Sequence, residues 1–178
     1  MLRMLLHCCC APCASYVLEY LSPFFVITAF CYNSNISPRE EHDKREAELR
    51  RLLSLAEYTN SVDMIAPEYS HAAFGDAFAP LWDEPEGGAR CARCFELRLE
   101  ETARHAASSG YDYYATTLSV SPHKDAKRLN GIGAMMGEKY GSIYLISDFK
   151  KRDGYKRSVE LSKRYGLYRQ SYCGCKRA

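Results

Sequence analysis

Short apolar runs alternate with segments of helical periodicity along this chain, and this alternation constrains the fold more than any other feature. The apolar runs have the length and the β-branched or aromatic content of strands, at residues 2–6, 24–31, 62–66, 111–120 and 143–147. The expected helices follow Pro12, span residues 39–58 and 92–107, begin at a Ser121 cap with Pro122 in the first turn, and span 158–165.

Strands that alternate with helices are typical of an α/β fold with a mostly parallel sheet. The length of 178 residues suits one hydrophobic core. We therefore expect a single catalytic domain over residues 1–178, with a Rossmann-like sheet of about five strands and helices on both faces. Residues 67–90 have no clear period, and we expect them to form a long loop that is either functional or mobile.

Membrane and secretory signals are not evident in the sequence. No apolar run reaches the roughly 18 residues that a membrane-spanning helix needs, and residues 1–6 are too short for a secretory signal. We therefore expect a soluble protein of the cytoplasm that has no membrane partner. Disulfides are rare in reducing compartments, so clustered thiols there more often bind metal or do redox work.

Nine cysteines carry most of the chemical information. Eight of them fall into three groups, which are Cys8, Cys9, Cys10 and Cys13; Cys91 and Cys94; and Cys173 and Cys175. The first group follows the first expected strand, and in open parallel sheets sites form at the carboxyl ends of the strands. The ninth, Cys31, lies in an apolar strand and is expected to be core packing.

Three explanations compete for the grouped thiols. Structural zinc needs four ligands, and an iron–sulfur cluster needs about four thiolates. Inert core packing does not readily explain a C-C pair, a C-x-x-C and a C-x-C in one chain. The chain has more cysteines than one zinc ion requires, and this surplus favours redox chemistry, although the spacing does not exclude zinc.

Charge is unevenly distributed. Residues 148–178 contain ten basic and three acidic residues, for a net charge of +7, whereas residues 1–147 carry −5. This basic tail suits either a polyanion such as nucleic acid or a solvated helix face, and charge alone does not decide between them. Its candidate nucleic-acid contacts are Lys150, Lys151, Arg152, Lys156 and Arg157.

The remaining polar candidates each have an alternative structural explanation. His7 could be a ligand or proton donor, or a satisfied histidine at a strand end. His123 and Asp125 follow the fourth expected strand, where they could act at a site or belong to a solvated helix start. The loop after the first strand contains no glycine, which excludes a Walker loop, a dinucleotide fingerprint and the Ser-Gly-Gly loop of ATP-pyrophosphatases.

Taken together, these motifs resemble the QueH-type epoxyqueuosine reductases. The resemblance covers nearly the whole chain through LLHCCCAPC (5–13), FCYNSNISPREE (30–41), EPEGGARCARCFELRLE (84–100), YDYYATTLSVSPHKD (111–125) and SDFKKRDGYKRSVELSKRYGLYRQSYCGC (147–175). It implies an oxidoreductase that reduces epoxyqueuosine to queuosine at the wobble position of tRNA. It also implies a fold similar to the ATP-pyrophosphatase and adenine-nucleotide hydrolase group.

The resemblance also implies roles for individual residues. A [4Fe-4S] cluster would be held by Cys9, Cys10, Cys91 and Cys94, and an additional iron by Cys13 with Cys10. Cys173 and Cys175 would be a redox-active pair that forms a disulfide, while Cys8 has no assigned role. The resemblance does not name the proton donors, and from their positions His7, His123 and Asp125 are the first candidates to test. The partners would be the anticodon loop of tRNA, contacted by the basic tail, and an external electron donor.

Two other functions stay open at this point. A cluster-dependent tRNA sulfur-transfer enzyme of related fold would need ATP, and the missing phosphate loop argues against it. A non-catalytic zinc-binding RNA module would unfold on chelation and show no redox activity.

Overall fold

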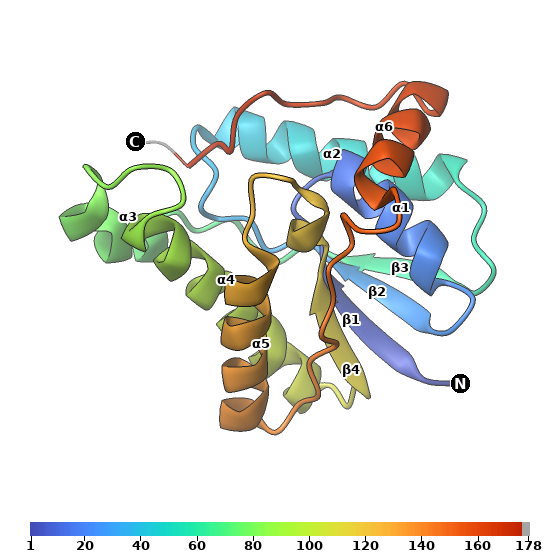
Figure 1. Ribbon diagram of the computed structural model, residues 1–178, viewed down its shortest axis with the longest axis horizontal. Helices are drawn as coiled ribbons and strands as arrows, with labels where there is room; N and C mark the ends of the chain where they lie inside the picture. Colours follow the sequence, from blue (N-terminus) through green and yellow to red (C-terminus); the bar gives the residue numbers. More distant parts are fainter. Residues whose placement is uncertain (176–178) are drawn as a thin grey trace.

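The computed structural model describes residues 1–175, so Lys176 and Arg177 of the basic tail lie outside the described residues. Its core is a parallel sheet of four strands in the order β3-β2-β1-β4 (Figure 1). The strands are β1 (Arg3–His7), β2 (Val26–Phe30), β3 (Val62–Ile65) and β4 (Tyr113–Thr116). The α/β class and the parallel sheet are confirmed. The expected count of about five strands is wrong, because segment 143–147 joins β4 only through an isolated bridge between Tyr114 and Tyr144.

Helices cover both faces of this sheet. Helices α1 (Ala11–Leu21), α2 (Arg39–Leu55) and α6 (Gly154–Arg164) lie on one side, and α4 (Ala89–Ser108) and α5 (Ala126–Tyr140) lie on the other (Figure 1). The alternation of β1 explains the two layers. Met4 and Leu6 pack into the α1 and α2 side, whereas Leu5 packs with Leu99 and Leu129 on the α4 and α5 side. All three β1 side chains are fully buried.

Residues 67–90 are more ordered than their lack of period suggests. They contain α3 (Ala72–Phe78) and a 3-10 turn over Ala79–Leu81, so the expectation of a long loop is wrong there. The reason is tertiary packing, because Phe74 and Phe78 are completely buried against Cys94, with Trp82 alongside. Trp82 thus holds this segment against the domain.

The segment after β4 also differs from expectation. Residues Thr117–Val120 form a 3-10 turn, and α5 begins at Ala126 rather than at a Ser121 cap. Asp125 is the N-cap residue, and its Oδ1 accepts hydrogen bonds from the backbone N–H groups of Lys127 (2.9 Å) and Arg128 (3.3 Å). Because α5 begins only at Ala126, residues 117–124 form a separate turn at the carboxyl end of β4.

Within residues 1–175, no helix is both long enough and apolar enough to cross a membrane.

Candidate active site

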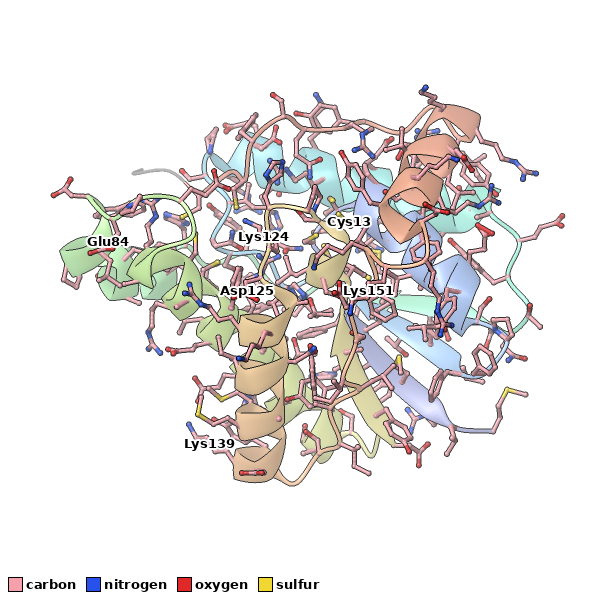
Figure 2. The ribbon with its side chains drawn as sticks, in the orientation of Figure 1. Cys13, Glu84, Lys124, Asp125, Lys139 and Lys151 are labelled. Carbon is pink, nitrogen blue, oxygen red and sulfur yellow. The ribbon has the colours of Figure 1, made fainter. Side chains whose placement is uncertain are left out.

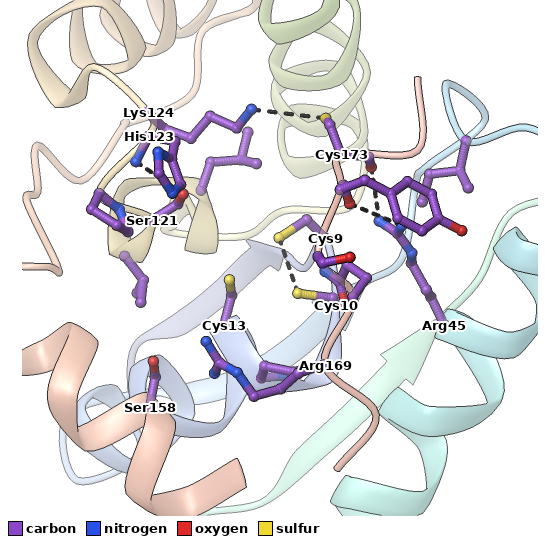
Figure 3. A pocket seen from close by; sticks show the side chains of 18 of the residues that line it. Cys9, Cys10, Cys13, Arg45, Ser121, His123, Lys124, Ser158, Arg169 and Cys173 are labelled. Carbon is purple, nitrogen blue, oxygen red and sulfur yellow. Dashed lines mark hydrogen bonds between the residues drawn. The ribbon is translucent and has the colours of Figure 1, made fainter. Parts of the chain in front are cut away.

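A cavity of about 460 Å³ opens at the carboxyl end of the sheet. Its walls come from the start of α1, the turn at residues 118–124, α6 and the chain segment 169–173 (Figure 3). This volume lies within the range of small-molecule sites, which are usually about 300–1,000 Å³. The sequence-based expectation of a site after the first strand is thus matched by a cavity at that place.

Three cysteine thiols converge at the base of this cavity. The Sγ atoms of Cys9, Cys10 and Cys13 all lie within 4.8 Å of one another, and those of Cys9 and Cys10 are 3.7 Å apart (Figure 3). Ligands of a tetrahedral ion with metal–sulfur bonds near 2.3 Å are spaced about 3.8 Å apart. The three thiols therefore form a group that could hold a metal ion, and sulfur donors favour zinc, copper(I) or iron.

Local backbone geometry produces this convergence. Cys10 is the extended N-cap residue of α1, with φ −169° and ψ 160°, and Pro12 lies in the first turn. The chain thus bends sharply between Cys9 and the helix, and Cys13 projects from the first turn toward the two preceding thiols. Hydrogen bonds from Cys10 and Cys13, together with the charge of Arg98, hold the pKa of Cys9 well below its usual range.

Cys91 and Cys94 lie in the first turns of α4, as expected, but they do not join this compact group. The Sγ atom of Cys91 accepts a hydrogen bond from the backbone N–H of Gly87 at 3.2 Å. Cys94 is buried beside Phe74 and Phe78, and burial raises its pKa to about 12. The structure therefore brings together Cys9, Cys10 and Cys13, and places Cys91 and Cys94 at the side of the site.

Arg98 on α4 connects these parts, and the sequence reasoning missed it. Arg98 is 3% exposed, and its guanidinium donates from Nε to His7 Nε2 (3.2 Å) and from Nη2 to Asn33 Oδ1 (2.5 Å). Its Nη1 atom lies 4.0 Å from the Sγ atom of Cys94. The sequence does contain a signal for a buried arginine, because position 98 lies on the same face of α4 as Phe95, Leu99 and Thr102.

Cysteine sulfur atoms lie around the guanidinium of Arg98. Among residues 1–175, no carboxylate forms an ion pair with this guanidinium, although a buried charge normally has a partner of opposite sign. Burial acts to lower the pKa of Arg98, but the neighbouring sulfur groups of Cys94, Cys9 and Cys173 raise it above its ordinary value. This arrangement fits thiolate ligands of a metal group better than it fits neutral core cysteines.

His7 lies beneath the cavity and does not line it. It is fully buried. Its Nε2 atom lies 3.2 Å from both Nε of Arg98 and the carbonyl oxygen of Tyr32, and its Nδ1 atom lies 2.9 Å from the hydroxyl of Thr116. Burial and the Arg98 charge lower the pKa of His7 to about 3. This geometry gives His7 the role of holding Arg98, and it does not place His7 as a proton donor to the cavity.

The other two candidate proton donors separate in the structure. His123 lines the cavity, whereas Asp125 does not and instead caps α5 with its carboxylate. Figure 2 labels Asp125 at the start of this helix. Lys124 also lines the cavity, with its side chain 11% exposed and its Nζ atom 3.8 Å from the Sγ atom of Cys173. Burial opposes ionisation of Lys124, but the thiols of Cys173 and Cys91 raise its pKa.

Cys173 and Cys175 are both free thiols with different surroundings. Cys173 forms part of the cavity wall, opposite the three clustered cysteines (Figure 3). Cys175 packs with Phe74, Phe78 and Cys94, and burial raises its pKa to about 11.

The candidate nucleic-acid contacts of the tail divide into two sets. Lys150 forms an ion pair with Asp148 at 2.8 Å, and Arg157 pairs with Glu19 at 3.0 Å and with Glu160 at 3.3 Å. The other three are exposed, namely Lys151, Arg152 and Lys156, and Nζ of Lys151 lies 3.9 Å from Asp148 Oδ2. Lys151 and Arg152 line a second depression of about 510 Å³ together with Tyr16 and Tyr20.

The two remaining cysteines have packing roles. Cys8 is fully buried in the core on the α1 side of the sheet, and its Sγ atom lies 3.4 Å from the carbonyl oxygen of Leu6. Cys31 is 4% exposed in the same core, as expected from its apolar strand.

Comparison with known proteins is consistent with this geometry. Residues 4–178 match the family model described as "Epoxyqueuosine reductase QueH". A curated QueH of Streptococcus pyogenes is 43% identical over 174 residues, which cover 97% of this chain and 68% of the relative. Those of Staphylococcus epidermidis and Thermotoga maritima are 40% and 34% identical, again over 97% of this chain, and over 74% and 88% of the relatives. The chain belongs to the QueH family of epoxyqueuosine reductases.

Proposed function

We propose that this chain reduces epoxyqueuosine to queuosine in tRNA, as a single catalytic domain. The reaction converts an epoxide into an alkene and releases its oxygen as water, which consumes two electrons and two protons. Membership of the family supports the reaction type. The observation that carries the proposal is the convergence of the Cys9, Cys10 and Cys13 thiols on a cavity large enough for a nucleoside.

The proposed cofactor is a [4Fe-4S] cluster held by Cys9, Cys10, Cys91 and Cys94, with an additional iron at Cys13 and Cys10. The thiol donor set suits iron, and the buried guanidinium of Arg98 offsets the negative charge that several thiolates would bring. The close spacing of Cys9, Cys10 and Cys13 supports a site for a single ion next to the cluster. When bound, such a group supplies electrons singly and a Lewis-acidic iron.

The chain's own residues provide the other requirements of the reaction. Lys124 and His123 on the cavity wall are placed to donate hydrogen bonds to the oxygen as it leaves, and Lys124 is the better enclosed of the two. Cys173, whose Sγ atom lies 3.8 Å from Nζ of Lys124, is placed to supply electrons together with Cys175, and an external electron donor then reduces the disulfide that they form. His7 and Asp125 are assigned to holding Arg98 and capping α5, and not to proton transfer.

The proposed partner is the anticodon loop of a tRNA bearing epoxyqueuosine. Proteins that recognise RNA by sequence usually bind single-stranded loops whose bases are splayed out, and the cavity of about 460 Å³ would receive such a nucleoside. The exposed cations of the tail and the nearby tyrosines suit the backbone and bases of neighbouring nucleotides. A tRNA substrate also supports the expected cytoplasmic location.

The decisive test is purification under anaerobic conditions, followed by measurement of iron and acid-labile sulfide and an assay with epoxyqueuosine-containing tRNA and a reductant. We expect iron with sulfide and conversion to queuosine, both lost in Cys9→Ser and retained in Cys31→Ala. Stoichiometric zinc without sulfide and without conversion would contradict the proposal and favour a zinc-binding RNA module. ATP hydrolysis stimulated by tRNA would favour a sulfur-transfer enzyme.

A further inference from the structure

The last described segment of the chain, residues 165–175, is an extended strap that lies along α2 (Figure 1). It contains no helix or strand, and charged side chains on one face of α2 hold its backbone. Arg51 donates to the carbonyl groups of Tyr165 and Gly166, and Glu48 accepts from the N–H of Tyr168. Arg45 donates to the last two carbonyl groups in this series, those of Tyr172 and Cys173.

Arg45 is the most deeply buried of the three α2 side chains that hold the strap. Its side chain is 5% exposed, and its Nη1 and Nη2 atoms lie 2.8 Å from the carbonyl oxygen of Cys173 and 3.3 Å from that of Tyr172. Its Nε atom donates to Glu41 Oε1 at 2.7 Å, and Glu41 is itself 10% exposed. The ion pair fixes the direction of the guanidinium, so that both remaining nitrogens face the backbone of the strap (Figure 3).

Gly174, between the two cysteines, packs closely against the guanidinium of Arg45. Its φ of +94° is rarely adopted by residues with side chains. A Cβ atom there would lie 3.0 Å from Nη2 of Arg45 and 3.2 Å from Cγ2 of Ile36. The carbonyl oxygen of Gly174 also accepts a hydrogen bond from the N–H of Ser37 at 2.9 Å. The backbone is thus held at three consecutive carbonyl groups, those of Tyr172, Cys173 and Gly174.

We propose that Arg45 is a positioning residue for the terminal dithiol, which it holds in the separated thiol form with Cys173 in the cavity wall; this inference rests on the function proposed above. In that function, oxidation of Cys173 and Cys175 to a disulfide releases two electrons and two protons, which balance conversion of the epoxide to alkene and water. An external dithiol then restores both thiols. Arg45 binds backbone carbonyl groups and not the sulfur atoms, so its effect is on the positions of the two thiols.

The test compares Arg45→Met with Arg51→Met in the full-length protein, purified anaerobically with its metal. Arg51 is the matched control, since it holds the same strap from the same helix through carbonyl groups distant from the dithiol. Each protein is equilibrated in buffers of reduced and oxidised dithiothreitol, and free thiols are alkylated. Mass spectrometry of the C-terminal peptide then gives the fraction of Cys173 and Cys175 present as disulfide.

We expect Arg45→Met to favour the disulfide by about tenfold, which corresponds to about 30 mV, because the contacts that stabilise the separated thiols are lost. Arg45→Lys, which keeps the charge beside Glu41, should give a smaller shift, and Arg51→Met none. An unchanged equilibrium in Arg45→Met, or an equal shift in Arg51→Met, would overturn the proposal. If Arg45→Met does not fold, the comparison of Arg45→Lys with Arg51→Lys decides the question in the same way.

This readout is independent of tRNA turnover. If the wild-type chain failed to convert epoxyqueuosine while the Arg45-dependent shift was present, the proposed function would be wrong and the positioning role correct. Conversion by the wild type together with an unchanged dithiol equilibrium in Arg45→Met would show that the proposed function is correct and the positioning role wrong.

Discussion

The Nε atom of Arg98 donates a hydrogen bond to Nε2 of His7 across 3.2 Å, and both side chains are enclosed by the protein. Nδ1 of the same imidazole lies 2.9 Å from the hydroxyl of Thr116, so polar contacts run from Arg98 through His7 to Thr116. A buried guanidinium supported by a neutral histidine retains its whole positive charge. That charge is then available to the thiols around it.

Replacing Arg98 by methionine is therefore expected to weaken metal binding by roughly tenfold or more, the range seen for residues that support metal ligands. It also leaves Asn33 Oδ1 without its donor, at a cost of about 1–3 kcal/mol in unfolding free energy. Iron content after anaerobic purification and urea unfolding measure the two effects. Arg93→Met on the exposed side of the same helix is the control, since Arg93 is 41% exposed and pairs with Glu96. Full iron content in Arg98→Met would show that its charge is not needed by the ligands.

Cys8 and Cys13 should respond in opposite ways to substitution. Cys8 is core packing, so Cys8→Ala should cost on the order of 1 kcal/mol of unfolding free energy and leave the metal content unchanged. Cys13 faces the cavity, so Cys13→Ser should lower the metal content with little effect on the stability of the metal-free protein. Metal analysis and denaturant unfolding of both variants check this. Loss of metal in Cys8→Ala alone would reverse the assignment.

Binding of the RNA should depend on the second depression. Tyr20 is 43% exposed and the Lys151 side chain is 77% exposed, so both are accessible to a nucleotide. We expect Tyr20→Ala to weaken binding of an anticodon stem-loop by about 1–3 kcal/mol, the usual value of one stacked base. Lys151→Ala should instead reduce the salt dependence, by about 0.7 in the slope of log K against log salt if one single-strand phosphate contact is lost.

Fluorescence anisotropy over a range of salt concentrations provides both numbers. Lys139→Ala is the control, because Lys139 lies at the far end of α5 and pairs with Glu100 (Figure 2). Equal effects of Lys139→Ala and Lys151→Ala would show that RNA binding depends on total charge and not on this surface.

The sequence predicts those parts of the fold that depend on local patterns. The apolar periods and Pro12 are local signals, and they place β1, α1 and β2 correctly. The predicted start of α5 is wrong because two capping signals lie four residues apart, and Asp125 accepts from two backbone N–H groups in the folded chain. Helix α3 has no such signal, because it is stabilised by contacts of Phe74 and Phe78 with Cys94, from a distant segment.

The site follows the same division. Convergence of Cys9, Cys10 and Cys13 was foreseeable from the bend that Pro12 imposes. The importance of Arg98 and Arg45 could also have been predicted from the sequence. Each lies on the buried stripe of its helix, where charged residues are rare unless they have a specific partner. Contact between α2 and the strap at residues 165–175 was not accessible, because it joins segments more than 100 residues apart through side-chain contacts to the backbone.

The acid sensitivity of the protein should depend on Glu41. Burial acts to raise the pKa of this carboxyl, but the hydrogen bond and charge of Arg45, with Tyr172 and Tyr168, lower it below the ordinary value of 4.5. A carboxyl with a lowered pKa in the folded state contributes stability that is complete above the unfolded value. That contribution is lost as the pH falls through the lower folded value. The unfolding free energy should therefore decrease below about pH 5.

Glu41→Gln should flatten this part of the curve and lower the unfolding free energy at pH 7, because Arg45 then lacks its buried partner. The comparison is Glu40→Gln, which removes an exposed carboxylate from the same turn of α2. Urea unfolding between pH 3 and pH 7 measures all three proteins. If the plots of unfolding free energy against pH for Glu41→Gln and the wild type were parallel over this range, Glu41 would not be the group responsible for the loss of stability in acid.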